Sequence, residues 1–275
     1  MPRIALVQQH AGPDKRANLD RGLAALETAA ASGARVVCFA ELAFEPFYPQ
    51  CRAAPGFEQL AEPIPGPTTD ALTAAARRLG VVVVANLFER DGSHCFDTSP
   101  VIDADGTLLG RTRMLHITDY PGFHEQAYYT PGDTGLPVYA TAAGRIGVAI
   151  CYDRHFPEAM RALALRGADL VVVPQAGTVG EWPEGLYEAE MRVAAFQNGY
   201  FVALCNRVGQ DGALEFAGES FVCSPEGVVL ARSPAKDENI LIVDVDLASA
   251  GGSHARRLFL RHRRPDLYAE WFAST

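Results

Sequence analysis

The stretch from Gly147 to Glu158 constrains the fold of this chain more than any other. Its sequence, Gly-Val-Ala-Ile-Cys-Tyr-Asp-Arg-His-Phe-Pro-Glu, joins an apolar run to a turn and then to a segment with Pro and Glu near its start. The pattern predicts a buried strand that passes through a sharp turn into a helix. Cys151 stands at the turn, beside backbone N–H groups of the helix start. Such groups lower a thiol pKa and bind an oxyanion, which are the two requirements of a cysteine nucleophile.

A structural role is the alternative interpretation of Cys151. Buried cysteines most often act as small hydrophobic side chains, so the position of one cysteine at a strand end does not establish catalysis. The choice between the two interpretations therefore depends on residues elsewhere in the chain.

Short apolar runs alternate with helical patterns along the chain, and its two halves have a similar order. Glu41 follows a predicted strand in the first half, and Cys151 follows one in the second. Two sheets packed face to face, with helices outside, bury strands of this kind. The strands are predicted at 3–8, 34–40, 81–88, 95–102, 107–117, 145–150, 170–174, 200–206, 216–224, 227–232 and 239–247, and the helices at 18–32, 68–79, from the Cys151 turn to about 166, and at 182–198.

We find no linker or low-complexity segment, so residues 1–275 are predicted to form a single domain. The C-terminal tail, residues 248–275, is rich in arginine and also carries apolar side chains such as Phe259 and Trp271. We expect this tail to pack on a partner subunit.

Composition excludes several classes of function. The 275 residues carry a formal charge of -9 without a basic block, which argues against a nucleic-acid partner. No run approaches the roughly 18 apolar residues of a membrane span, and the first residues lack the pattern of a signal peptide. The six cysteines are scattered, with no CxxC pair, which is typical of a cytoplasmic protein with reduced thiols.

Four motifs occur in a fixed order over residues 3–247. They are Phe39-Ala40-Glu41-Leu42; Pro121-Gly122-Phe123-His124-Glu125 with Tyr129-Thr130-Pro131-Gly132-Asp133; Ile150-Cys151-Tyr152-Asp153 with Phe156-Pro157-Glu158; and Asn206-Arg207-Val208-Gly209 with Gly218-Glu219-Ser220. Together they resemble the nitrilase, or carbon–nitrogen hydrolase, superfamily. The run that begins at Cys151 is most similar to the branch of amidohydrolases that act on N-carbamoyl amino acids and amines, such as beta-ureidopropionase.

This resemblance implies an α/β fold, a four-layer α-β-β-α sandwich that becomes eight-layered on dimerisation. It also implies a Glu–Lys–Cys triad without a cofactor or metal. In this sequence Glu41 would be the general base, Cys151 the nucleophile that forms an acyl-enzyme, and Glu125 a carboxylate that orients the site. The N–H of Tyr152 would bind the oxyanion. The expected substrate is a small amide or N-carbamoyl molecule, and the expected assembly is a homodimer.

The chain departs from the family at the position of the catalytic lysine, where it has Met114. Arg113 is adjacent, but side chains alternate along a strand, so it should point away from the pocket. Arg154 is three residues from Cys151. In one interpretation it binds a substrate carboxylate or the pocket acids, and in the other it forms a salt bridge at the start of the helix. Tyr48 and Trp182 are candidate pocket walls, for which core packing is the alternative.

Two hypotheses about function follow. The first is a cysteine-dependent hydrolase of a small amide or N-carbamoyl compound. The second is a catalytically impaired homologue that binds a small ligand or a protein in the same pocket, because Met114 removes a cation whose loss typically lowers turnover about 10²- to 10³-fold. Dispersed histidines at 116, 124 and 155 do not predict a metal site.

Overall fold

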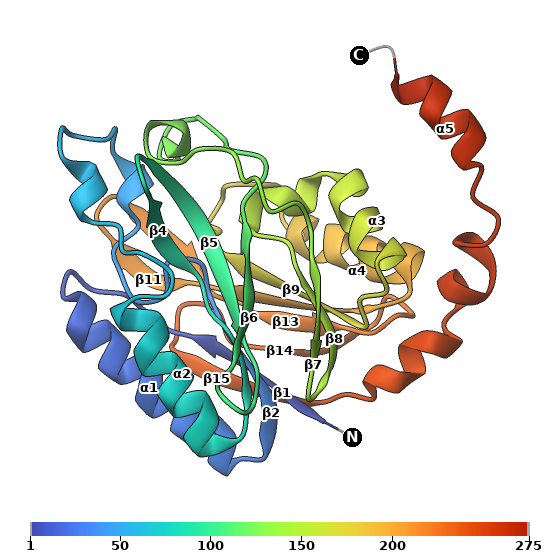
Figure 1. The fold of residues 1–275 in the computed structure, drawn as a ribbon, viewed down its shortest axis with the longest axis horizontal. Helices are drawn as coiled ribbons and strands as arrows, with labels where there is room; N and C mark the ends of the chain where they lie inside the picture. Colours follow the sequence, from blue (N-terminus) through green and yellow to red (C-terminus); the bar gives the residue numbers. More distant parts are fainter. Residues whose placement is uncertain (1, 274–275) are drawn as a thin grey trace.

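The computed structural model describes residues 2–273, in which two β-sheets lie face to face with helices on both outer sides (Figure 1). The seven-stranded sheet runs in the order β15 (Asn239–Asp244), β1 (Arg3–Gln8), β2 (Ala34–Phe39), β3 (Val82–Val84), β5 (His94–Ile102) and β4 (Leu87–Asp91), with β6 (Leu108–Arg113) paired to β5. The six-stranded sheet runs in the order β14 (Val229–Arg232), β13 (Phe221–Cys223), β10 (Phe201–Asn206), β9 (Leu170–Gln175), β8 (Gly144–Val148) and β7 (Val138–Thr141). The predicted four-layer α/β sandwich is confirmed.

Parallel strands form the centre of each sheet, and helices connect them. Strands β1, β2 and β3 are parallel to one another, as are β8, β9 and β10. Parallel neighbours require a crossover connection, usually a helix, and this explains why the two halves of the chain have a similar order. The crossovers are α1 (Lys15–Ala31), α2 (Pro67–Leu79), α3 (Pro157–Leu165) and α4 (Leu186–Asn198).

Three hydrophobic clusters correspond to the three interfaces between the four layers. The central cluster includes Leu6 of the first sheet and Val172 of the second. A second cluster packs α1 and α2 against the first sheet, and a third packs α3 and α4 against the second. Burial of apolar surface at all three interfaces is the main stabilising contribution to this fold.

Several element boundaries differ from those predicted. Helix α1 begins at Lys15 instead of residue 18, because the Asp14 side chain accepts hydrogen bonds from two N–H groups of its first turn. The single strand expected at 81–88 is divided into β3 and β4 around the buried Asn86. The helix expected from 182 begins at Leu186, after Gly185 with a φ of 80°. Strands β7 and β11 (Val208–Asp211) were not predicted, and the single strand expected at 216–224 is divided into β12 (Leu214–Ala217), which forms a hairpin with β11, and β13.

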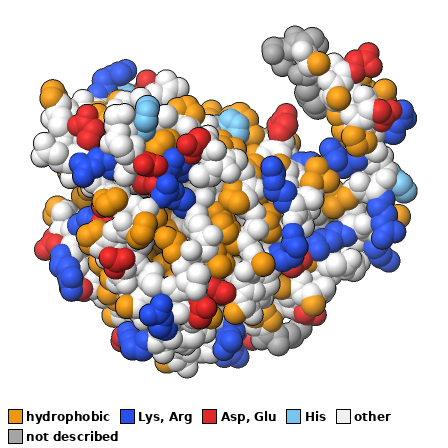
Figure 2. Space-filling view, viewed as in Figure 1, with side chains coloured by type: hydrophobic (Ala, Val, Ile, Leu, Met, Phe, Trp, Pro, Cys, Tyr) orange, Lys and Arg blue, Asp and Glu red, His pale blue; other side chains and the backbone are white. Residues whose placement is uncertain are grey.

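The C-terminal tail leaves the body of the sandwich after β15 and ends in α5 (Pro265–Phe272), which stands apart in Figure 1. Figure 2 shows positively charged side chains gathered along this tail, all of which are arginines in the sequence. The Trp271 side chain on α5 is 58% exposed. Contact of the tail with a partner subunit remains a prediction. Among residues 2–273, no helix combines the length and the apolar character needed to cross a membrane.

Candidate active site

Cys151 lies just beyond β8, at the first residue of a 3-10 turn, Cys151–His155, that precedes α3. Its φ is 40°, a left-handed conformation that is uncommon for a residue other than glycine. Asp153 holds the turn, because its carboxylate accepts hydrogen bonds from the backbone N–H of Leu115 at 3.2 Å and of His116 at 3.0 Å. The predicted strand–turn–helix is therefore confirmed, with a short 3-10 turn between strand and helix.

Glu41 follows β2 at the same edge of the sandwich, and the chain turns sharply after it. Leu42 has a φ of 44°, and its N–H donates to the side-chain oxygen of Asn86 at 2.8 Å. The buried Arg207 guanidinium donates to the backbone carbonyls of Glu41, Leu42 and Glu45 and to the Asp211 carboxylate. These contacts fix the backbone turn from which the Glu41 side chain projects.

The Glu41 carboxylate and the Cys151 thiol meet in the interior between the two sheets. Both residues are buried, and Cys151 is only 6% exposed. The two Glu41 oxygens have no partner of good hydrogen-bond geometry, although the Cys151 thiol and the Asp97 carboxyl are within hydrogen-bonding reach. The two residues predicted as base and nucleophile are thus brought together from opposite halves of the chain.

Two further carboxyl groups complete this cluster. Glu125, on the 3-10 turn Glu125–Ala127, is fully buried, and neither of its carboxylate oxygens has a partner. Asp97, on β5, accepts from the Asn86 amide through one oxygen, while its other oxygen has no partner. Asp97 was not predicted. The only signal for it in the sequence is a single carboxylate inside a largely apolar strand.

Burial dominates the electrostatics of the cluster. Burial, and then repulsion from Glu125, raises the pKa of Glu41 to about 8. Burial likewise raises the pKa values of Asp97 and Glu125 above their ordinary range. The next largest cause is charge repulsion, from Glu41 for Asp97 and from Asp97 for Glu125. Burial, followed by the negative charge of Glu41, raises the pKa of the Cys151 thiol. At neutral pH these shifts favour the protonated forms of the three acids and of the thiol.

Met114 is buried in the central hydrophobic cluster together with Cys151. The backbone N–H of Met114 donates to the backbone carbonyl of Asp97 at 2.9 Å, so Met114 lies beside the acid cluster. Arg113 points the other way, as predicted, and pairs with Glu89 at 2.7 Å and with Asp133 at 2.9 Å. The neighbouring arginine therefore does not replace the missing lysine.

The remaining predicted residues differ in position. Arg154 donates to the Cys151 carbonyl at 2.9 Å and pairs with Glu190 at 3.4 Å, which agrees with the salt-bridge interpretation. Trp182 packs on Tyr120 and His155 near the thiol. Tyr48 instead directs its hydroxyl to Glu45 at 3.2 Å.

Tyr152 packs edge-on against His155 and Phe156. Glu181, which was not predicted, accepts hydrogen bonds from Tyr120 and Tyr187. Burial, and then the charge of Glu181, raises the pKa of both tyrosines, and Cys151 adds a smaller contribution. Across residues 2–273 no three His, Cys, Asp or Glu side chains have an arrangement that suits a metal ion.

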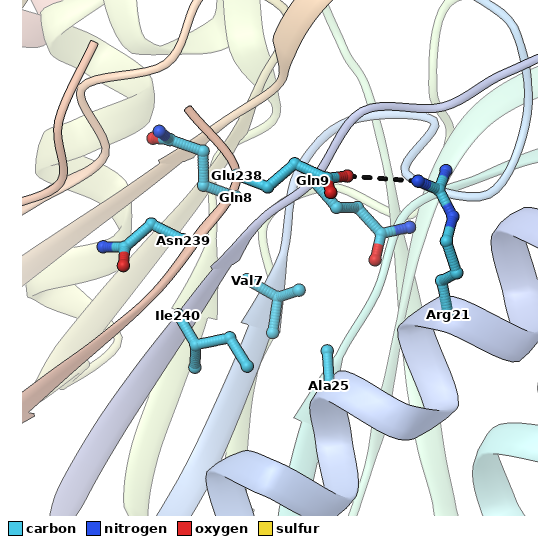
Figure 3. A pocket seen from close by; sticks show the side chains of 8 residues that line it. All are labelled: Val7, Gln8, Gln9, Arg21, Ala25, Glu238, Asn239 and Ile240. Carbon is cyan, nitrogen blue, oxygen red and sulfur yellow. Dashed lines mark hydrogen bonds and ion pairs between the residues drawn. The ribbon is translucent and has the colours of Figure 1, made fainter. Parts of the chain in front are cut away.

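A surface hollow of about 450 Å³ lies elsewhere, between α1 and the edge of the first sheet (Figure 3). Arg21 and Glu238 form an ion pair across it at 3.2 Å. Its lining includes neither a cysteine nor any member of the acid cluster, so it is separate from the candidate site.

Comparison with known proteins identifies the chain's relatives. Residues 3–254 match the carbon–nitrogen hydrolase family. The chain belongs to this family. The N-carbamoylputrescine amidase of Solanum lycopersicum is 35% identical to it over 282 residues, which cover 96% of this chain and 93% of that protein. The crystal structure of a carbon–nitrogen hydrolase from Helicobacter pylori G27 superposes with a TM-score of 0.90, at 30% identity over 98% of each chain.

A third relative is an amidase from Nesterenkonia sp. AN1. The structure of a Glu-to-Gln mutant of it, in which the acetamide moiety of fluoroacetamide is covalently added to the active-site cysteine, has a TM-score of 0.83 and 29% identity, over 98% of this chain and 97% of that one. The resemblance to the nitrilase superfamily and its N-carbamoyl branch is confirmed. The chain is therefore an amidohydrolase of the carbon–nitrogen hydrolase family.

Proposed function

We propose that the protein hydrolyses a small amide or N-carbamoyl compound through a covalent intermediate on Cys151. The observation that carries this proposal is the buried contact between the Cys151 thiol and the Glu41 carboxylate. Glu41 takes the thiol proton, and the sulfur attacks the carbonyl carbon. Glu41 then returns the proton to the departing nitrogen, the C–N bond breaks, and water hydrolyses the thioester with Glu41 again acting as base.

The neighbouring groups support this reaction in distinct ways. Glu125 orients the substrate nitrogen with its free carboxylate oxygens. The N–H of Tyr152, the second residue of the turn, binds the oxyanion. Arg154 acts by holding the Cys151 carbonyl, and Trp182 forms part of the wall around the substrate. Tyr48 serves the fold by holding Glu45.

A catalytically impaired homologue is the second candidate, and Met114 is the observation that favours it. A thioether cannot stabilise the thiolate or the oxyanion as an ammonium does. An impaired protein would still bind an amide, but Cys151 would not form an acyl adduct during turnover.

Intact-protein mass spectrometry distinguishes the two candidates. The protein is mixed with a panel of acetamide, N-carbamoylputrescine and N-carbamoyl-β-alanine, quenched in acid within seconds, and digested to locate any adduct, while ammonia is measured in parallel. Our proposal predicts an acyl adduct on Cys151 and ammonia release, both absent in Cys151→Ala and retained in the control Cys51→Ser, which changes an exposed cysteine. Binding of these compounds without an adduct or ammonia would establish the impaired homologue.

We further propose a homodimer in which the C-terminal tail packs on the partner. The supporting observation is a groove of about 600 Å³ between α3 and the tail, lined by Leu165, Tyr268 and Trp271 among others. Leu165 and Trp271 are both strongly exposed in the single chain. Sedimentation velocity should give a dimer for the natural chain and a monomer for Trp271→Glu. A monomer for the natural chain at micromolar concentration would contradict this arrangement.

A further inference from the structure

Within residues 2–273, no lysine or arginine side chain forms a hydrogen bond with the three carboxyl groups of the active-site cluster. Five carboxyl oxygens of Glu41, Asp97 and Glu125 have no hydrogen-bond partner of good geometry, although each residue is at most 1% exposed and only the Cys151 thiol and the Asp97 carboxyl are within reach of Glu41. The Tyr129 hydroxyl, also buried and without a partner, belongs to the same group, since all three acids act on its pKa after burial itself. Buried polar atoms normally have partners, so this arrangement indicates a ligand that supplies hydrogen-bond donors, and a ligand with positive charge would also favour ionisation of the acids.

The described part of the chain cannot supply that charge from its own lysines. The sequence has only two lysines, and the structure places both elsewhere. Lys15 pairs with Glu45 at 3.0 Å, and Lys236 pairs with Glu215 at 3.3 Å.

The nearby arginines do not pair with these acids. Arg113 is turned away to Glu89, and Arg154 donates to the Cys151 carbonyl and lies 3.4 Å from Glu190, while its Nε and Nη2 make no hydrogen bond of good geometry. Burial, Glu41 and Glu125 raise the pKa of the Cys151 thiol more than the charge of Arg154 lowers it. Arg207 donates to backbone carbonyls and Asp211, and it opposes the rise in the Glu41 pKa less than any other named influence.

We propose that this site accepts amidinium or guanidinium compounds and hydrolyses them to the corresponding amide or urea and ammonia. This proposal rests on the pairing of Cys151 with Glu41 in the proposed function. A planar amidinium carries N–H donors at fixed angles around one carbon, and carboxylates bind such groups through two parallel hydrogen bonds. Glu41, Asp97 and Glu125 offer the acceptors, and the ligand replaces the absent lysine as the cation.

The chemistry balances with the groups present. Glu41 takes the proton of the Cys151 thiol, and the sulfur attacks the amidinium carbon as the C=N electron pair moves onto nitrogen. The tetrahedral adduct is therefore neutral, and no oxyanion forms in this step. Glu41 protonates one nitrogen, its C–N bond breaks, and ammonia leaves a thioimidium on Cys151.

Water then attacks the thioimidium carbon as Glu41 takes a proton from it. The C–S bond breaks, the hydroxyl proton returns to sulfur, and the amide is released. Glu41 gives its proton to ammonia, so the sum is amidinium plus water to amide plus ammonium. Met114 suits this sequence, because an ammonium at position 114 would repel a cationic substrate and has no oxyanion to stabilise in the first step.

The test compares isosteric pairs on the full-length protein. Acetamidine is paired with acetamide, and agmatine, the guanidino isostere, with N-carbamoylputrescine. NMR follows the amide or urea product, and mass spectrometry follows the adduct on Cys151, with Cys151→Ala as background. We expect turnover of the amidinium member with a thioimidium adduct. The amidinium-to-amide ratio of kcat/KM should fall at least 100-fold in Met114→Lys and at least 10-fold in Asp97→Asn.

The outcomes separate this proposal from the one on which it rests. If amides label Cys151 and amidinium compounds neither label it nor turn over, the amidinium proposal is wrong and the amide proposal stands. A ratio that Met114→Lys leaves unchanged contradicts the cation argument as well. If neither class labels Cys151 in protein with an unchanged melting curve, both proposals fail.

Discussion

Replacing Met114 by lysine tests how much the missing cation limits amide hydrolysis. Because the pKa of Glu41 is raised to about 8, roughly a tenth of the molecules hold Glu41 ionised at pH 7. An ammonium about 4 Å away contributes roughly 4 kcal/mol at an effective dielectric constant of about 20, which lowers that pKa by about three units. Nearly all molecules would then have the base ready, a gain of about tenfold.

The same lysine can also donate to the developing oxyanion. Such a donor typically changes turnover about 10²- to 10³-fold. The two effects together predict a rise in kcat/KM for acetamide of roughly 10³- to 10⁴-fold at pH 7. The rate of the natural protein should climb with pH toward 8, as Glu41 ionises, whereas the rate of Met114→Lys should stay level from pH 6 to 8.

The assay is ammonia release from acetamide, with melting temperature as a check of folding. Met114→Leu is the matched control, because it changes the side chain without adding charge, and its rate should stay close to that of the natural protein. A folded Met114→Lys with less than a twofold gain, or an equal gain in Met114→Leu, would refute the reasoning.

Three further predictions follow from the same contacts. Glu41→Gln should raise the melting temperature at pH 8 but have little effect at pH 5. The reason is that a carboxyl with a raised folded-state pKa stabilises the fold below its unfolded pKa of about 4.5 and loses that stabilisation as pH rises toward 8. An equal effect at both pH values would contradict this. Arg207→Met should cost about 3–5 kcal/mol in chemical denaturation, since it leaves buried carbonyls and a carboxylate unpaired, whereas the exposed Arg16→Met should cost less than about 0.5 kcal/mol. Asp153→Asn should lower kcat more than it raises KM, because the turn that positions Cys151 loses its charged acceptor; a change in KM alone would argue against that role.

The layered fold was predictable because the sequence divides it into short apolar runs and helical segments of ordinary length. Strand β1 has the predicted bounds, and β5 begins one residue earlier than predicted. The division of 81–88 could not be predicted, because the amide of Asn86 is fixed by Leu42 and Asp97, which are distant in the sequence. Boundaries of this kind depend on tertiary partners that local patterns do not contain.

The site shows the same contrast. Alternation of side chains along a strand correctly predicted that Arg113 points away from the pocket. The family motifs predicted that Glu41, Glu125 and Cys151 lie close together. Asp97 escaped prediction because β5 is buried on both faces, so alternation assigns its side chains to neither.

The thiol pKa of Cys151 tests the central claim most directly. Alkylation with iodoacetamide across pH 5 to 10, read residue by residue by mass spectrometry, gives this pKa, and the exposed Cys51 serves as an internal reference. The pKa of this thiol, raised by burial, Glu41 and Glu125 more than Arg154 lowers it, should lie above the ordinary value of about 8.5, and Met114→Lys should bring it down. A Cys151 pKa below 7 in the natural protein would mean that positive charge outweighs burial and the two glutamates at the sulfur, which contradicts the account given above.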